Sequence, residues 1–219
     1  MLYSIFIALF LAISACAASP AQAVVPTITK QDTRKVLVVF GDSLSAGYGV
    51  PRGQSYPDDL QRTLDAQGYA WRVVNLGISG DTTSGGLARV NTGTALRPAL
   101  VLLELGGNDG LRGLPLSMTR ENLDQIIGAF KRVGARVVLA GMTLPPNYGP
   151  DYIHSFEAIY TDLAAKYKLT LIPFLLRDIA TQDMRYFQRD GIHPTAEGAQ
   201  IVSTTVFRAI KPLLSGVKN

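Results

Sequence analysis

Short apolar runs recur along the chain, and amphipathic segments separate them. The runs are rich in β-branched residues and are apolar on both faces, a pattern typical of strands buried in a parallel sheet. Five such runs occur, at 35–40, 72–75, 100–104, 136–140 and 169–173. We therefore predict five parallel β-strands that are covered on both faces.

The segments between these runs carry the spacing of helices with one apolar face. Ser55 and Asp58 form a capping-box pattern, and Pro57 suits the first turn of the helix that they predict. Other stretches place apolar residues at i, i+3, i+4 and i+7, and they cover 123–130, 156–167 and 202–213. Strand–helix alternation along the whole chain predicts a single-domain α/β sandwich with a doubly wound sheet.

The beginning of the chain has the features of an export leader. No Asp, Glu, Lys or Arg occurs before Lys30, and 5–13 form an apolar run that is too short to span a bilayer. The tripeptide Ala-Gln-Ala at 21–23 fits a signal-peptidase site. We therefore expect residues 1–23 to be removed and the protein to be periplasmic or secreted.

A second interpretation of the leader is a lipobox at 13–16. The leader would then end at residue 15, and a lipid on Cys16 would anchor the protein to a membrane. An uncleaved anchor is the third alternative. Behind the leader we expect an N-terminal extension at 24–34, one folded domain at 35–214 and a short tail at 215–219.

Composition narrows the class of protein. The chain has 219 residues, 47% hydrophobic and 17% charged, so its one domain is large enough to bury a sizeable core. The single cysteine, Cys16, excludes a disulfide framework and a cysteine-ligated zinc site. The formal net charge is +4, but the basic residues are scattered. Nucleic acid is therefore not an expected partner, and a weak attraction to anionic lipid is left open.

Polar, glycine-rich clusters follow the predicted strands. Three of them begin at Gly41, Asn75 and Gly106, and a fourth, at Asp190, precedes the last predicted helix. Because ligands bind outside the carboxyl ends of parallel strands, we expect these clusters to converge on one edge of the sheet. Each cluster alone could be an ordinary turn, but together they contain the groups that acyl transfer needs.

Ser43, Asp190 and His193 fit the roles of a serine hydrolase. A serine nucleophile needs a neutral imidazole to accept its proton and a carboxylate to fix the tautomer of that imidazole. The chain has 2 histidines, and His193 follows Asp190 by three residues, so Nδ1–H can donate to the carboxylate while Nε2 points outward. Pro194 keeps the backbone of His193 out of the helical region. His154 lacks such a neighbour, and we expect it at the surface or at the rim of the site.

Three groups could donate hydrogen bonds to a tetrahedral oxyanion. A helix that starts after Ser43 would direct the backbone N–H of Ser43 there, Gly80 offers an unshielded backbone N–H, and Asn108 offers a side-chain amide. An asparagine in a turn is the ordinary alternative for Asn108. The GxSxG motif of the common α/β-hydrolase elbow is absent from the sequence, because Ser45 follows Ser43 where that motif requires glycine.

At these residues the chain resembles the SGNH, or GDSL, hydrolase family. The segment 41–44 resembles its first sequence block, Gly80 the second, 106–109 the third, and Asp190 with His193 the fifth. The resemblance implies that Ser43 is the nucleophile, that Gly80 and Asn108 are oxyanion donors, and that Asp190 orients His193 as the base. Longer stretches are similar to the periplasmic arylesterases and the multifunctional thioesterase I/protease I/lysophospholipases of this family, at 75–89, 104–113 and 144–149.

The same resemblance implies a flavodoxin-like, three-layer α/β/α fold with a five-stranded parallel sheet and no cofactor. The implied substrate is a small acyl ester or thioester, cleaved through an acyl-enzyme, with membrane contact through a lipid substrate left open. In that group the loop equivalent to 110–115 borders the acyl site. Gly110 and Leu111, together with Leu144 and Pro145, are therefore expected to bind the substrate.

A different class of enzyme is also compatible with the sequence, because three aspartates could bind a metal ion: Asp42, Asp81 and Asp109. Each follows a glycine-bearing loop at a strand end, and such a trio could hold Mg²⁺ for a metal-dependent phosphatase. That function would leave the serine, histidine and amide groups unused. Hydrogen bonding within the loops is the simpler interpretation of these aspartates. A non-catalytic lipid- or carbohydrate-binding module is a further alternative.

Overall fold

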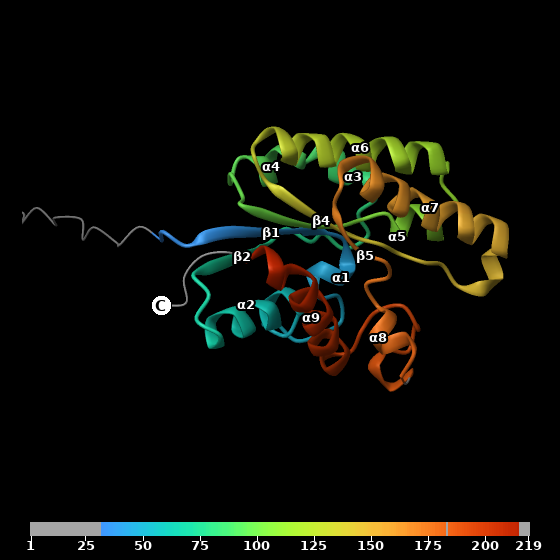
Figure 1. Ribbon diagram of the computed structural model, residues 1–219. Coiled ribbons are helices and arrows are strands. Elements are labelled where there is room, and N and C mark those ends of the chain that lie inside the picture. Colours follow the sequence, from blue (N-terminus) through green and yellow to red (C-terminus); the bar gives the residue numbers. More distant parts are fainter. Residues whose placement is uncertain (1–31, 183, 215–219) are drawn as a thin grey trace, which may run out of the picture. The chain divides into compact units, whose positions relative to one another are not determined.

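The computed structural model describes residues 32–182 and 184–214, and from Arg34 onward the described residues belong to one compact unit (Figure 1). The predicted leader, the two alternative fates of Cys16 and the tail at 215–219 lie outside the described residues. They therefore remain predictions from the sequence.

A parallel sheet forms the middle layer, and within the described residues it has five strands in the order β2-β1-β3-β4-β5. The predicted strands are thus confirmed, with ends that differ by no more than one residue. Both faces of the sheet are covered, which explains why the runs are apolar on both sides. The strands are β1 Lys35–Gly41, β2 Trp71–Asn75, β3 Leu100–Glu104, β4 Arg136–Ala140 and β5 Thr170–Ile172.

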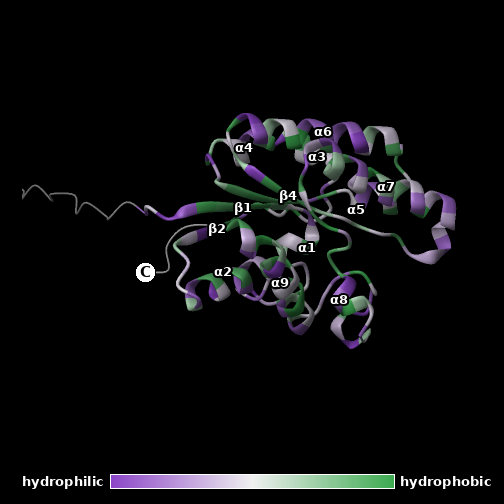
Figure 2. Cartoon of the chain, in the orientation of Figure 1, coloured by the Kyte–Doolittle hydropathy of each residue, from purple (hydrophilic) through white to green (hydrophobic). Residues whose placement is uncertain are grey.

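Helices cover the two faces of this sheet as the alternating pattern predicted (Figure 1). One face carries α3 Thr83–Ala88, α4 Val90–Thr94, α5 Gly107–Leu111, α6 Leu116–Arg132 and α7 Pro150–Tyr167. The other carries α2 Tyr56–Ala66, α8 Arg177–Ala180 and α9 Ala196–Ile210. Figure 2 shows hydrophobic residues along the strands and hydrophilic ones spread over the helices. In the described part of the chain, no helix has the length and apolar character to cross a bilayer.

Local sequence signals explain two of the helix ends. The capping box at the start of α2 is present, because Ser55 and Asp58 each accept a hydrogen bond from the backbone of the other. The last predicted helix ends earlier than expected, at Ile210, and a 3₁₀ turn, η3 Lys211–Leu213, follows it. Pro212 explains this difference, since proline has no N–H to continue the α-helical pattern.

The strand order places a topological switch point between β1 and β3. The chain goes from β1 to β2 on one side and then crosses over to β3 on the other side of β1. In open α/β sheets the loops that diverge at such a point leave a crevice where ligands bind. The loops after β1 and β3 start with Asp42 and Leu105, so the fold itself brings two of the predicted polar clusters together.

Candidate active site

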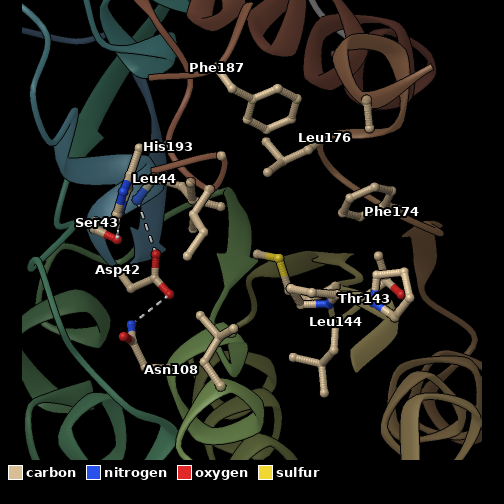
Figure 3. Close-up of a pocket in the computed structure, with 18 of the residues that line it drawn as sticks. Asp42, Ser43, Leu44, Asn108, Thr143, Leu144, Phe174, Leu176, Phe187 and His193 are labelled. Carbon is tan, nitrogen blue, oxygen red and sulfur yellow. Dashed lines mark hydrogen bonds between the residues drawn. The ribbon is translucent and has the colours of Figure 1, made fainter. Parts of the chain in front are cut away.

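Ser43 lies on a sharp turn at the carboxyl end of β1. It is the first residue of the short helix α1 Ser43–Ala46, and Asp42 caps this helix by accepting the backbone N–H of Leu44 on Oδ1 at 3.0 Å. Gly47 ends the turn with a φ of 77°, a left-handed conformation that favours glycine. The Ser43 hydroxyl is thereby held at the switch point, where Figure 3 shows it beside His193.

Asp190, His193 and Ser43 form a continuous line of hydrogen bonds. Nδ1 of His193 lies 2.7 Å from Oδ2 of Asp190, and Nε2 lies 2.9 Å from the Ser43 hydroxyl. Because the carboxylate can only accept, the proton of the neutral ring belongs on Nδ1, which leaves Nε2 free to accept the serine proton. The geometry therefore suits general-base activation of Ser43.

The loop that carries this pair is tightly built. Oδ1 of Asp190 accepts the backbone N–H groups of Ile192 and His193 at 2.9 and 3.0 Å. Partial burial would raise the pKa of Asp190, but these two N–H groups and the imidazole outweigh it and hold the pKa at about 2. Gln188 fastens the loop by donating to the carbonyls of Tyr48 and Pro194. Asp190 is thus ionised and fixed at neutral pH.

Asn108 links the loops that surround the nucleophile. It is the second residue of α5, and its Nδ2 donates to the carbonyl of Asp81 at 2.9 Å and to Oδ2 of Asp42 at 3.2 Å. Gly80 directly precedes Asp81 with a φ of 80°, and its carbonyl accepts from Arg112 at 3.0 Å. The structure thus joins Asn108 to Ser43 in one site and places Gly80 in the neighbouring loop.

An apolar cavity of about 510 Å³ opens beside Ser43. Figure 3 shows Ser43, His193 and Asn108 on one side of it and Phe174, Leu176 and Phe187 on the other. The hydrophobic part of its lining comes from α1, from α5, from the loops after β4 and β5 and from the segment before α9, and comprises Leu44, Leu111, Met142, Leu144, Pro145, Pro146, Phe174, Leu176, Ala180, Met184, Phe187 and Ile192. The cavity has the character of a site for an apolar acyl chain.

The four predicted substrate-binding residues differ in their places. Leu111, Leu144 and Pro145 line the cavity, and their role in binding substrate stays a prediction. Gly110 is buried and is not among the residues that line the cavity, and a Cβ there would lie 2.8 Å from Leu144 and 2.9 Å from Phe156. Glycine is needed at this position for packing, and it is the next residue, Leu111, that faces the cavity.

The residues on the wall of the cavity opposite Ser43 were not identified from the sequence. Phe174 and Leu176 follow the last strand and have no helical or strand-like spacing that would single them out. Their position in the sequence could have identified them, because apolar residues in a loop at the carboxyl end of a strand lie where ligands bind. His154 was placed correctly: it is exposed, in the first turns of α7, and is not among the residues that line the cavity.

The three aspartates of the rival metal site have separate partners. Asp81 pairs with Arg89 at 2.7 Å, whereas Asp109 accepts the backbone N–H and the hydroxyl of Thr83 at 2.9 and 2.6 Å. Asp42 caps α1, as described above. Among the described residues, no three His, Cys, Asp or Glu side chains gather into a possible metal site. The aspartates instead form hydrogen bonds and an ion pair, as the simpler interpretation from the sequence proposed. Asp109 and Asp42 also bond to segments outside their own loops.

Several known proteins are similar to this chain in sequence and in fold. The chain is 44% identical to esterase TesA of Pseudomonas aeruginosa over 189 residues, which are 85% of this chain and 93% of the esterase. It is 37% identical to the thioesterase 1/protease 1/lysophospholipase L1 of Escherichia coli over 183 residues, 82% and 85% of the two chains. The crystal structure of the psychrotrophic esterase EstA from Pseudoalteromonas sp., inhibited by monoethylphosphonate, matches with a TM-score of 0.78 at 31% identity and covers 83% of this chain and 100% of EstA.

A family profile agrees with these relatives. Residues 39–201 match the GDSL-like Lipase/Acylhydrolase family, and this span includes the nucleophile turn, Asn108 and the Asp190–His193 pair. The flavodoxin-like sandwich and the resemblance stated from the sequence motifs are both confirmed. The chain therefore belongs to the GDSL-like lipase/acylhydrolase family and is a carboxylic ester hydrolase.

Proposed function

We propose that the protein hydrolyses carboxylic esters and thioesters of apolar acyl groups through an acyl-enzyme on Ser43. One observation carries this proposal: the line of hydrogen bonds from Asp190 through His193 to Ser43 ends at the mouth of an apolar cavity. The cavity offers room for the acyl chain, and the serine hydroxyl lies at its entrance.

The geometry supports a two-step reaction. Ser43 Oγ attacks the carbonyl carbon while Nε2 of His193 accepts its proton, and Asp190 stabilises the imidazolium that forms. The tetrahedral intermediate then collapses, and His193 gives the proton to the departing alcohol or thiol. In the second step a water molecule attacks the acyl-enzyme with the same general base. The carboxylic acid leaves and Ser43 is regenerated.

We assign stabilisation of the oxyanion to the backbone N–H groups of Ser43 and Gly80 and to the amide of Asn108. In the free enzyme Nδ2 of Asn108 makes one shorter hydrogen bond to Asp81 and one longer hydrogen bond to Asp42, at 2.9 and 3.2 Å. The longer one is the bond that an incoming oxyanion would share. The amide is thus already oriented before substrate binds, which is the property that makes such donors effective.

A panel of p-nitrophenyl esters from short to long acyl chains, with an acyl-CoA alongside, tests the proposed function. We expect hydrolysis in the presence of EDTA, and kcat/KM that rises with acyl length until the cavity is filled, because each buried methylene contributes about 0.8 kcal/mol. Complete loss of ester hydrolysis with EDTA would instead show that the reaction depends on a metal ion. If no ester or thioester is hydrolysed, a binding module becomes the better hypothesis.

We further propose that the protein is exported and works in the periplasm or outside the cell. The charge-free start and the apolar run at 5–13 support this proposal, with a lipid on Cys16 as the alternative fate of the leader. Mass spectrometry of the mature N-terminus distinguishes the two. A start at Val24 supports simple export, whereas a modified Cys16 at the N-terminus would show an anchored lipoprotein.

A further inference from the structure

A buried polar cluster lies directly beneath the nucleophile turn and takes no direct part in acyl transfer. Its members are Glu104 at the end of β3, Ser45 of α1 and Tyr56 of α2, which are 0%, 0% and 1% exposed. The Ser45 hydroxyl donates to Oε2 of Glu104 at 2.6 Å, so the Tyr56 hydroxyl, 2.7 Å from Ser45, is the donor in that pair. An acidic side chain is almost never buried so completely unless it is paired.

Glu104 holds the chain on both sides of Ser43. The backbone N–H of Asp42 donates to Oε2 of Glu104 at 3.2 Å, and Ser45 donates to the same oxygen. A single carboxyl oxygen therefore fixes the residue before the nucleophile and the second residue after it. Gly41 makes this approach possible, because a Cβ at that position would overlap Oε2 of Glu104 and the Ser45 hydroxyl.

Asp42 connects this cluster to the oxyanion donors. Its backbone is held by Glu104, while its carboxylate accepts from the N–H of Leu44 at 3.0 Å and from Nδ2 of Asn108 at 3.2 Å (Figure 3). The Asn108 amide is therefore oriented jointly by Asp42 and by the carbonyl of Asp81. A displacement of Asp42 would shift the Ser43 backbone and weaken one of the two hydrogen bonds that orient the amide.

Burial raises the pKa of both carboxyl groups at this point, Glu104 and Asp42. Burial raises the pKa of Glu104 well above its ordinary value, and the negative charge of Asp42 raises it further. Burial also raises the pKa of Asp42, to about 6, against the lowering effects of the Leu44 N–H, Glu104, His193 and Asn108. The protonated form of Glu104 is thus strongly favoured relative to a glutamate in water, and Oε2 can accept the hydrogen bonds from Asp42 and Ser45 in either protonation state.

We infer that Glu104 is a positioning residue for acyl transfer, which holds the turn of Ser43 and, through Asp42, the amide of Asn108. This inference rests on the proposed function, because it assigns Glu104 to the geometry of the same transition state. Glu104 is not among the residues that line the cavity, so its removal leaves the apolar binding surface in place. The expected effect therefore falls on kcat and not on KM.

The variants Glu104→Leu and Glu104→Gln test this role. Leucine removes the acceptor, and we expect kcat to fall roughly 10- to 100-fold with KM little changed, since small misplacements of catalytic groups have effects of this size. Glutamine is neutral and keeps an acceptor oxygen, so kcat should stay within about threefold of wild type. Ser203→Ala, at a buried polar side chain of α9 outside the cavity, is the matched control and should keep the wild-type kcat.

A double-mutant cycle with Asn108→Ala separates positioning from general stability. Asn108→Ala alone should lower kcat about 100- to 1000-fold if the amide is an oxyanion donor. If Glu104 acts partly through that amide, Glu104→Leu will have a smaller effect in the Asn108→Ala background than in wild type. The folded fraction of each variant is measured by circular dichroism, so that kcat is expressed per folded molecule.

Three results would overturn the inference while the wild type remains an active esterase. The first is a folded Glu104→Leu variant with the kcat of the wild type. The second is a Glu104→Gln variant whose kcat is as low as that of Glu104→Leu. The third is a double-mutant cycle in which the effects of Glu104→Leu and Asn108→Ala on kcat are additive. An inactive wild type would instead overturn the proposed function itself. The same ester assay therefore tells the two failures apart.

Discussion

Ser43→Ala is expected to lower kcat by roughly 10⁴- to 10⁶-fold, because the serine oxygen is the atom that forms the acyl-enzyme. The substitution leaves the Cβ in place and removes one hydrogen bond, to Nε2 of His193. The free energy of unfolding should therefore change by only about 1 kcal/mol. Hydrolysis of a p-nitrophenyl ester, together with a thermal unfolding curve, measures both quantities.

A fluorophosphonate probe gives this prediction a second readout. The wild type should gain one covalent phosphonyl group on Ser43, identified by mass spectrometry of the peptide, and Ser43→Ala should gain none. Ser117→Ala is a suitable control, because Ser117 is an exposed serine on α6 and should not affect labelling. Esterase activity retained by a clean preparation of Ser43→Ala would end the assignment of the nucleophile.

Asp190→Asn should reduce kcat by about 10⁴-fold while the loop keeps its shape. The asparagine oxygen can still accept the N–H groups of Ile192 and His193 that Oδ1 of Asp190 accepts now. Its amide nitrogen would face Nδ1 of His193, which must then act as the acceptor. The imidazole proton moves to Nε2, and His193 can no longer accept the proton of Ser43.

The pH profile and a matched variant check this interpretation. Because the pKa of Asp190 is held below its ordinary value, at about 2, the carboxylate stays charged at lower pH than an ordinary aspartate. Wild-type activity should therefore show no loss from protonation of Asp190 across the usual assay range. Asp178→Asn is the control, since the Thr205 hydroxyl and Arg208 likewise lower the pKa of Asp178, which is not among the residues that line the cavity. An Asp190→Asn variant within about tenfold of wild type would contradict the assigned role.

The sequence predicted those parts of the molecule that depend on local pattern. The apolar runs predicted the strands because both faces of this sheet are buried, and Ser55 with Asp58 predicted a helix start because capping involves only neighbouring residues. The scarcity of histidine limited the choice of base to His193 and His154. Each of these signals is contained in a short segment or in the composition.

The parts that could not be predicted depend on contacts between distant segments. Glu104 looked like the ordinary polar end of an apolar run, and only packing shows that it meets Asp42 and Ser45 beneath the nucleophile. Gly110 was expected to face the substrate, but the side chains of Leu144 and Phe156 cover it. Tertiary packing, which no local spacing encodes, decided both outcomes.

The part of the cavity wall opposite the nucleophile comes from other stretches of chain than the reacting groups. The wall opposite the nucleophile is built by loops after β4 and β5, with Phe174 and Leu176 among its side chains, whereas Ser43 and Asn108 are fixed at the ends of β1 and β3. Surface loops accept substitution more readily than the elements that they connect. Substitutions in the loops after β4 and β5 should therefore change which acyl chains bind while Ser43 and Asn108 keep their positions, so that acyl selectivity can vary without loss of catalytic power.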